Sequence, residues 1–365
     1  MAAIHGGNLI KAAKKSGFKP DELIDFSANI NFLGPPEIIL EEIKNNVEGI
    51  KNYPEAKAKR IKKLIADHHQ LSPQNIAVGN GASELIYQIT KVLNPKKVMV
   101  VDPSFSEYES AAKSIGSEII RFGLKKENDF QIEVKKLTEE LSEDLDLLFI
   151  CNPNNPTGTL LELNEIEALL AAAKDKAILL VLDEAFIDFL PAEKADSALE
   201  LLAKYNNLII MRSLTKLFAL PGLRLGYIVT AENRVMKLEK NRDPWSVNYF
   251  AQLAAEIIFS EREEIDKYLK NSFEKIASEK NYLYTNLQAI KTLKVFKANA
   301  NFIFIDISKT AINAKRLENK LLEAKIMIRN CDSYNGLEDD YIRIAVKDRK
   351  ANQLLINQLK KILNQ

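Results

Sequence analysis

The middle of the chain alternates short, uninterrupted hydrophobic runs with longer amphipathic stretches. The hydrophobic runs lie at residues 97–101, 147–151, 177–182 and 208–211. Continuous runs of this length are typical of strands that are buried on both faces of a parallel sheet. The stretches between them, such as 165–174, have the spacing of amphipathic helices. The alternation predicts a three-layer α/β domain, in which helices cover both faces of a parallel sheet.

The pattern changes after residue 245, where long helical stretches begin and continue to residue 283. The rest of the chain mixes strand-like runs with helical patterns, at 302–305, 313–324, 326–328, 341–346 and 350–363. This mixture predicts a smaller α+β domain. We therefore expect a large domain over residues 36–245. The small domain is expected to combine residues 246–365 with the loop-rich segment 1–35.

Length and composition fit a two-domain globular protein. The chain has 365 residues, of which 46% are hydrophobic and 28% are charged. Its net charge of +1 gives no indication of nucleic-acid or membrane binding. Residues 1–7 lack the basic and hydrophobic segments of a secretory signal. Two cysteines, Cys151 and Cys331, are too few for a disulfide framework or a zinc site. We expect a cytoplasmic protein without a metal.

Unusual polar residues follow the carboxyl ends of the predicted strands, where open α/β sheets bind ligands. The first group is Gly81, Ala82 and Ser83, in a glycine-rich turn that opens a helix. The free N–H groups of a helix N-terminus can bind a phosphate. A plain tight turn explains this group equally well.

Three further positions could contact a planar, charged ring. Phe105 could stack on such a ring, although a core aromatic is the commoner role. Asn155 lies in the turn 152–158, where prolines and a glycine would hold its amide rigidly enough to donate to a phenolate oxygen. Asp183 ends a wholly hydrophobic strand, and a carboxylate there is costly unless it is paired. Its partner could be a protonated pyridine nitrogen or a structural salt bridge.

Lys216 is the most informative residue, because it follows a buried strand with Ser213 before it and Arg224 after it. A lysine amine can form a Schiff base with an aldehyde. A hydroxyl and a guanidinium can bind the phosphate of the same molecule. Together these groups suit pyridoxal phosphate. Most lysines lie at the surface, but the order of the five motifs argues against that role here.

The chain resembles fold-type I pyridoxal-phosphate enzymes of the aspartate aminotransferase superfamily, close to the histidinol-phosphate aminotransferase group. The resemblance covers nearly the whole chain. It implies that Asp183 pairs with the pyridine nitrogen, that Asn155 bonds the ring oxygen and that Phe105 stacks on the ring. It also implies that Lys216 is the Schiff-base lysine. The phosphate contacts that it implies are Gly81, Ala82, Ser83, Ser213 and Arg224.

The resemblance also bears on assembly. Tyr53, in the motif 51–54, is similar to the tyrosine that reaches the cofactor phosphate of a neighbouring subunit. It implies a homodimer with the active site at the subunit interface.

Two arginines near the end of the chain are candidate substrate anchors. Arg329 and Arg343 lie at or within strand-like segments, where an unpaired guanidinium would be expensive. Two such arginines suit a doubly anionic substrate, with a carboxylate and a phosphate or a second carboxylate. Pairing of one of them with Asp339 or Asp340 is the alternative.

Within the superfamily, the chain is similar to the branch that decarboxylates L-threonine O-3-phosphate. The matching motifs stand at 5–8, 25–31, 183–189, 212–216, 221–227 and 244–248. The similarity implies formation of (R)-1-amino-2-propanol O-2-phosphate in cobalamin biosynthesis. The substrate contacts that it implies are His5, Gly6, Asn29, Asn155, Arg329 and Arg343. Phe186 stands where aminotransferases usually have tyrosine, so the electronics near the imine should differ.

Three alternatives remain open at the level of sequence. An aminotransferase acting on histidinol phosphate would share the whole cofactor site. A decarboxylase preferring L-serine O-phosphate differs only by one substrate methyl group, which is worth about 1–3 kcal/mol. A cofactor-binding regulator without turnover is disfavoured, because the chain offers neither a spare segment nor a basic patch for DNA.

Overall fold

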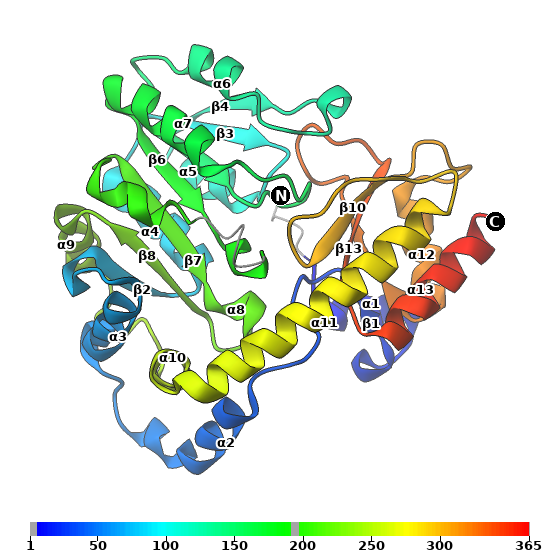
Figure 1. Ribbon diagram of the computed structural model, residues 1–365, viewed down its shortest axis with the longest axis horizontal. Coiled ribbons are helices and arrows are strands. Elements are labelled where there is room, and N and C mark those ends of the chain that lie inside the picture. The colour runs from blue at the N-terminus through cyan, green and yellow to red at the C-terminus, as the bar shows by residue number, and fades with distance from the viewer. Residues whose placement is uncertain (1–5, 191–196, 365) are drawn as a thin grey trace.

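The computed structural model of the protein describes residues 6–190 and 197–364. A large sheet lies beside a smaller one, which packs with the last two helices, α12 (Ala314–Glu323) and α13 (Arg349–Ile362) (Figure 1). The long helix α11 (Arg262–Gln288) runs from one region to the other. Across the described ranges, none of the helices is both long and apolar enough to cross a membrane.

The large sheet has the strand order β2-β8-β7-β6-β5-β3-β4. Its strands are β2 (Ile76–Asn80), β3 (Lys97–Asp102), β4 (Glu118–Gly123), β5 (Leu147–Cys151), β6 (Leu179–Asp183), β7 (Leu208–Ser213) and β8 (Leu225–Thr230). The hydrophobic runs that predicted strands form β3, β5, β6 and β7. The carboxyl ends of these four strands therefore lie along one edge of the sheet.

One strand of the large sheet, β8, runs antiparallel to its neighbours. The strand β8 pairs antiparallel with both β7 and β2, whereas β3 to β7 pair with one another in parallel. The four predicted strands are parallel, whereas β8, which the sequence did not predict as a strand, is antiparallel. Only residues 214–224 connect β7 to β8, and a parallel return needs a crossover of a dozen or more residues. Because the link is this short, the chain reverses direction.

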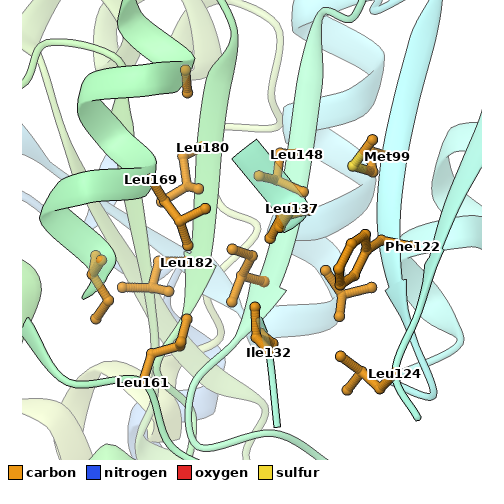
Figure 2. Packing of buried hydrophobic residues seen from close by; sticks show 14 of the residues in the cluster. Met99, Phe122, Leu124, Ile132, Leu137, Leu148, Leu161, Leu169, Leu180 and Leu182 are labelled. Carbon is orange, nitrogen blue, oxygen red and sulfur yellow. The ribbon is translucent and has the colours of Figure 1, made fainter. Parts of the chain in front are cut away.

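Alternate side chains of the buried strands face opposite layers of helices. Leu148, Leu180 and Leu182 pack on one face, against α6 (Val134–Glu140) and α7 (Leu163–Asp175) (Figure 2). Val181 and Ile209 pack on the other face. The helices there are α4 (Ala82–Leu93), α5 (Glu107–Ser114) and α9 (Glu232–Lys240). The predicted three-layer α/β arrangement is confirmed.

The small sheet has the order β12-β13-β10-β9 and is antiparallel throughout. Its strands are β9 (Lys294–Val295), β10 (Phe302–Asp306), β12 (Arg329–Asn330) and β13 (Tyr341–Ala345). Side chains of α11, α12 and α13 share one hydrophobic cluster with Ile303, Ile305 and Ile344. Phe304, which alternates with these residues along β10, packs instead into the core of the large sheet. The small sheet is thus buried on both faces.

The N-terminal segment packs against the C-terminal part of the chain. The strand β1 (Ile24–Asp25) pairs in parallel with β11 (Ile326–Met327), and Phe26 is fully buried in the cluster of the small sheet. This segment was expected to be loop-rich, but it also forms α1 (Leu9–Ser16), which begins where the side chain of Asn8 accepts the N–H of Lys11. Residues 24–26 therefore lie in contact with the C-terminal part of the chain.

The remaining helices are α2 (Glu37–Asn45), α3 (Lys59–His69), α8 (Leu214–Leu217) and α10 (Tyr249–Ser260). The helix α10 packs on α2 and α3, although it follows the predicted boundary at residue 245. The boundaries 36–245 for one domain and 1–35 with 246–365 for the other stay a prediction.

We predict that replacing a central core residue lowers the stability of the whole protein. Leu180 in β6 is fully buried, so Leu180→Ala should lower the free energy of unfolding by about 2–5 kcal/mol through lost contacts and a cavity. Leu354→Ala, at a position that is 36% exposed on α13, is the matched control and should cost far less. Urea unfolding followed by circular dichroism measures both. Equal effects of the two variants would contradict the assignment of this core.

Candidate active site

A cavity of about 410 Å³ lies where the strand ends of the large sheet meet the N-terminal segment and the small sheet. Its walls carry most of the residues that the sequence singled out. Those lining it are Gly6, Asn29, Ala82, Ser83, Phe105, Asn155, Asp183, Ser213, Lys216, Arg224, Arg329 and Arg343. Segments that are far apart in the sequence therefore converge on one site.

Two predicted residues of the described chain are not among those that line the cavity. Gly81 lies directly before the start of α4. Tyr53 is 84% exposed, and its aromatic contact among the described residues is with Trp245, at 5.1 Å between centroids. His5 lies outside the described residues. Within one chain, Tyr53 therefore does not form part of the cavity wall.

One end of the cavity is built to hold an anion. The helix α4 begins at Ala82 and directs free backbone N–H groups toward the cavity. The guanidinium of Arg224 lies so close to Gly81 that a Cβ there would sit 2.6 Å from Nη2, and Gly81 has a φ of +82°. The positive φ favours glycine at this position, because an L side chain would be strained there. The hydroxyl of Ser213 lies 2.8 Å from that of Thr215 at the same end. These donors fit a phosphate group.

Lys216 contributes an amine to the wall of the cavity. The lysine lies in the short helix α8, directly after β7. Burial lowers the pKa of Lys216 from 10.5 to about 8, and the positive charges of Arg343 and Arg224 act in the same direction. Asp183 opposes this shift but does not cancel it. A substantial fraction of the amine is therefore neutral near physiological pH and able to attack an aldehyde.

Asp183 is a buried carboxylate at the end of β6. One oxygen accepts a hydrogen bond of 2.6 Å from the hydroxyl of Tyr108, and the other accepts the N–H of Ala185 at 2.9 Å. Burial raises the pKa of Asp183, although these two donors favour its ionised form. The alternative of a structural salt bridge applies to its neighbour, because Glu184 pairs with Arg212 at 2.8 Å. In the described ranges Asp183 forms no such ion pair.

Asn155 is held by the turn that the sequence predicted. The amide of Asn154 donates to the carbonyl of Pro103 at 3.0 Å and to the hydroxyl of Thr157 at 2.8 Å, which anchors this turn to the end of β3. The side-chain oxygen of Asn155 accepts hydrogen bonds from Arg343 and from the hydroxyl of Tyr334. The Asn155 side chain therefore joins the large sheet to the small one.

The two candidate anchor arginines enter the cavity from the small sheet. Arg329 in β12 and Arg343 in β13 are direct cross-strand partners, so their side chains lie on the same face. Arg343 also donates to the carbonyl of Ser27 at 2.6 Å, and Arg329 donates to the hydroxyl of Ser333 at 2.7 Å. Among the described residues, neither arginine pairs with Asp339 or Asp340. Asp339 instead accepts the backbone N–H of Lys315.

Two residues of the site were not singled out from the sequence. Tyr108 belongs to a motif that had been noted, and its spacing of three from Phe105 at the start of α5 could have indicated that both face the cavity. Tyr334 lies in a loop between two short strands, where its sequence context carries no signal. Its ring packs under Arg329, with the guanidinium carbon 5.2 Å from the ring centroid.

The anion cradle, the buried carboxylate and the lysine with a lowered pKa together define a pyridoxal-phosphate-dependent enzyme. The chain belongs to the family of class I and II aminotransferases, whose sequence model matches residues 21–359. The cofactor used by this family is pyridoxal 5′-phosphate. The fold is accordingly fold-type I, with the mixed seven-stranded sheet and the small antiparallel sheet.

Known proteins similar to this chain include members with two activities. It is 36% identical to the threonine-phosphate decarboxylase of Salmonella typhimurium, over 98% of this chain and 96% of that protein. The structure of a histidinol-phosphate aminotransferase from Clostridium acetobutylicum superposes with a TM-score of 0.86 and 32% identity, covering 94% of this chain and 99% of the other. That of an L-threonine-O-3-phosphate decarboxylase from Porphyromonas gingivalis gives 0.81 and 25%, covering 93% and 99%.

We predict that the apoenzyme takes up pyridoxal phosphate at a rate that rises with pH around a midpoint of about 8. A lysine with a lowered pKa loses its proton above that pH, and only the neutral amine reacts. The rate of the change in absorbance, measured between pH 6 and 10, gives the midpoint. Arg343→Gln should move the midpoint upward, because one of the positive charges that lower the pKa is removed. A rate that still rises steeply at pH 10 in the unaltered protein would refute the buried setting of Lys216.

Proposed function

We propose that the protein decarboxylates L-threonine O-3-phosphate to (R)-1-amino-2-propanol O-2-phosphate, as a step of cobalamin biosynthesis. In this scheme Lys216 and Asp183 are the catalytic residues. The cofactor contacts that we propose are Gly81, Ala82, Ser83, Phe105, Asn155, Ser213 and Arg224. The substrate contacts that we propose are Gly6, Asn29, Asn155, Arg329 and Arg343, together with His5.

The observation that carries the proposal is the placement of Arg329 and Arg343 directly opposite each other in the small sheet. Like charges that face each other across two strands destabilise a sheet. Both are also buried, at 7% and 5% exposure, and the acceptors of Arg343 are uncharged. An anionic ligand would offset this cost. Two arginines beside Lys216 suit a substrate with a carboxylate and a phosphate as well as an amine.

In the proposed reaction, the cofactor supplies the chemistry at Cα and residues of the chain orient the substrate. Pyridoxal phosphate, when bound, supplies an aldehyde that condenses with amines and a ring that accepts the electron pair from a bond broken at Cα. Arg329 and Arg343 are proposed to bind the two anionic groups of the substrate and so to fix which bond at Cα would break. If that is the bond to the carboxylate, CO2 would leave without the electron pair of the bond, which the cofactor would accept.

A proton must then be added to Cα to complete the reaction. We assign this proton transfer to Nζ of Lys216, which lines the same cavity and whose pKa of about 8 permits both protonation states at neutral pH. Phe186 also lines the cavity and cannot donate a hydrogen bond to the ring oxygen. The aminotransferases that the chain resembles usually have tyrosine at this position, which supports a different outcome at Cα.

The second candidate function is a histidinol-phosphate-type aminotransferase. It is favoured by the superposition on the enzyme from Clostridium acetobutylicum. Its substrate also carries an amine and a phosphate, but its reaction needs a 2-oxo acid as acceptor. Decarboxylation of L-serine O-phosphate is a third possibility, which shares every proposed contact.

We predict that the holoenzyme releases CO2 from L-threonine O-3-phosphate without any 2-oxo acid. Lys216→Ala should lower this rate at least about 100-fold, because it removes the proposed acid and base. For L-serine O-phosphate, the loss of one methyl contact should lower kcat/KM by about 10–200-fold. Carbon-13 NMR of the products, with and without 2-oxoglutarate, measures each reaction. Product that forms only with 2-oxoglutarate would contradict the decarboxylase proposal and support the aminotransferase function instead.

We also propose that the enzyme is a homodimer in which Tyr53 reaches the cofactor phosphate of the partner subunit. Large hydrophobic side chains gather at the surface of α2 and the turn that follows it, at Leu40, Val47, Ile50 and Tyr53, with Trp245 beside Tyr53. Their exposed fractions lie between 40% and 84%. Such a gathering is typical of an interface between subunits. A second copy of the chain is the occupant that we propose.

We predict that Ile50→Asp produces monomers with weakened cofactor binding, since it places a charge in the middle of the proposed interface. Ile50 is 64% exposed in the single chain. Met236→Asp, at a position 58% exposed on α9, is the matched control and should leave the assembly unchanged. Sedimentation equilibrium gives the mass of each variant. A dimer of unchanged affinity for Ile50→Asp would rule out this surface as the interface.

A further inference from the structure

Tyr108 directs its hydroxyl at the most buried carboxylate of the site. The tyrosine lies in α5, is 1% exposed, and donates to Oδ2 of Asp183 at 2.6 Å. This length lies within the 2.5–2.7 Å that is usual between a hydroxyl and a carboxylate. The contact links a helix on one face of the large sheet to the end of its central strand β6.

The ring of Tyr108 is fixed from two sides. It stacks on Phe149 with the centroids 4.9 Å apart and the planes 8° from parallel. Phe105 meets it edge-on, at 5.7 Å and 79°. A buried ring clamped in this way cannot turn its hydroxyl away from Asp183 without disturbing the core around β5. The donor is therefore preorganised, and its position does not depend on whether a ligand is bound.

The surroundings of Asp183 make this donor important. Burial of the carboxylate favours its neutral form, and raises the pKa of Asp183. The opposing groups are the two hydrogen-bond donors and the more distant charge of Lys216. Cys151, which also lines the cavity, is a poor donor because its thiol hydrogen bonds to the carbonyl of Pro153 at 3.3 Å. The hydroxyl of Tyr108 is the side-chain donor that Asp183 has among the described residues.

We propose that Tyr108 is a positioning residue that keeps the proton shared by Asp183 and the cofactor's ring nitrogen on the nitrogen. The proposal rests on the pairing of Asp183 with that nitrogen. A hydrogen bond from a neutral phenol stabilises the carboxylate and has little effect on the carboxylic acid. Without it, the buried ion pair loses stability relative to the pair in which the proton has moved to Asp183. The ring accepts electrons well only while its nitrogen is protonated.

Tyr108 itself does not take part in proton transfer. Burial raises the pKa of Tyr108 well above its usual value, and the charge of Asp183 acts in the same direction. The phenol is therefore a neutral donor at neutral pH. Its role is confined to the carboxylate, which distinguishes it from residues that contact the substrate.

The test is Tyr108→Phe, which removes the hydroxyl and keeps the ring stacked on Phe149. The apoenzyme is loaded with pyridoxal phosphate labelled with nitrogen-15 in the ring. We expect the nitrogen resonance to move downfield, toward that of neutral pyridine, and the Kd for the cofactor to rise roughly 10–100-fold. Thermal unfolding of the apoenzyme verifies that the variant is folded.

The matched control is Tyr205→Phe. Tyr205 is 6% exposed and also donates to a carboxylate, that of Glu167 at 3.2 Å, but it lies outside the cavity. It should change neither the resonance nor the Kd. Asp183→Asn is the second control. In that background Tyr108→Phe should cause no further rise in Kd, because the two residues act through one bond.

Three results would overturn the proposed role of Tyr108. An unchanged nitrogen resonance in folded Tyr108→Phe overturns the proposal even if the Kd rises, because the hydroxyl would then act only on packing. Additive effects of Tyr108→Phe and Asp183→Asn on the Kd also overturn it. If Asp183→Asn alone leaves the Kd and the resonance unchanged, the pairing of Asp183 with the ring nitrogen fails, and this proposal fails with it. None of these readouts depends on which substrate the enzyme uses.

Discussion

The site depends on the balance of charge around a carboxylate that the fold removes from water. Asp183 ends the central strand of the large sheet, where its burial is costly unless donors and a cation compensate. Tyr108 and the N–H of Ala185 supply the donors. The cavity wall carries four cationic side chains, those of Lys216, Arg224, Arg329 and Arg343, against the carboxylates of Asp183 and Glu107. This excess of positive charge prepares it for a phosphorylated cofactor and an anionic substrate.

The large sheet explains why these groups can be held so closely. Asp183 ends β6, Lys216 follows β7 and Arg224 precedes β8, and the strands themselves are fixed by packing on both faces. The antiparallel strand β8 adds a close backbone contact, because a Cβ at Gly226 would lie 2.8 Å from the backbone nitrogen of Ala82. The strand therefore passes directly beneath the start of α4. Arg224, which precedes β8, is placed against Gly81 by the same contact.

The sequence predicted the layers of the large domain and the cofactor side of the site, because both follow from local patterns. Buried strands are continuous hydrophobic runs, and the polar residues after them stand out. The direction of β8 was not predicted, since a strand run does not record its direction. Tyr108 and Tyr334 were missed for a related reason. Their hydrogen bonds to Asp183 and Asn155 join residues 75 and 179 positions apart, and no local signal marks such contacts.

The large and small sheets meet at the side chain of Asn155. Asn155 belongs to the large sheet, and accepts hydrogen bonds from Arg343 and Tyr334 of the small one. Asn335, next to Tyr334, donates to Glu109 of α5 at 2.7 Å, which ties the same loop to the helix that carries Tyr108. A residue proposed to bind the cofactor ring is thus in direct contact with one proposed to bind the substrate. Any shift of the small sheet would therefore move the proposed substrate anchor relative to the proposed cofactor contact. Orientation at Cα is what selects among reactions that share one cofactor, so this contact is where we expect such a selection to be made.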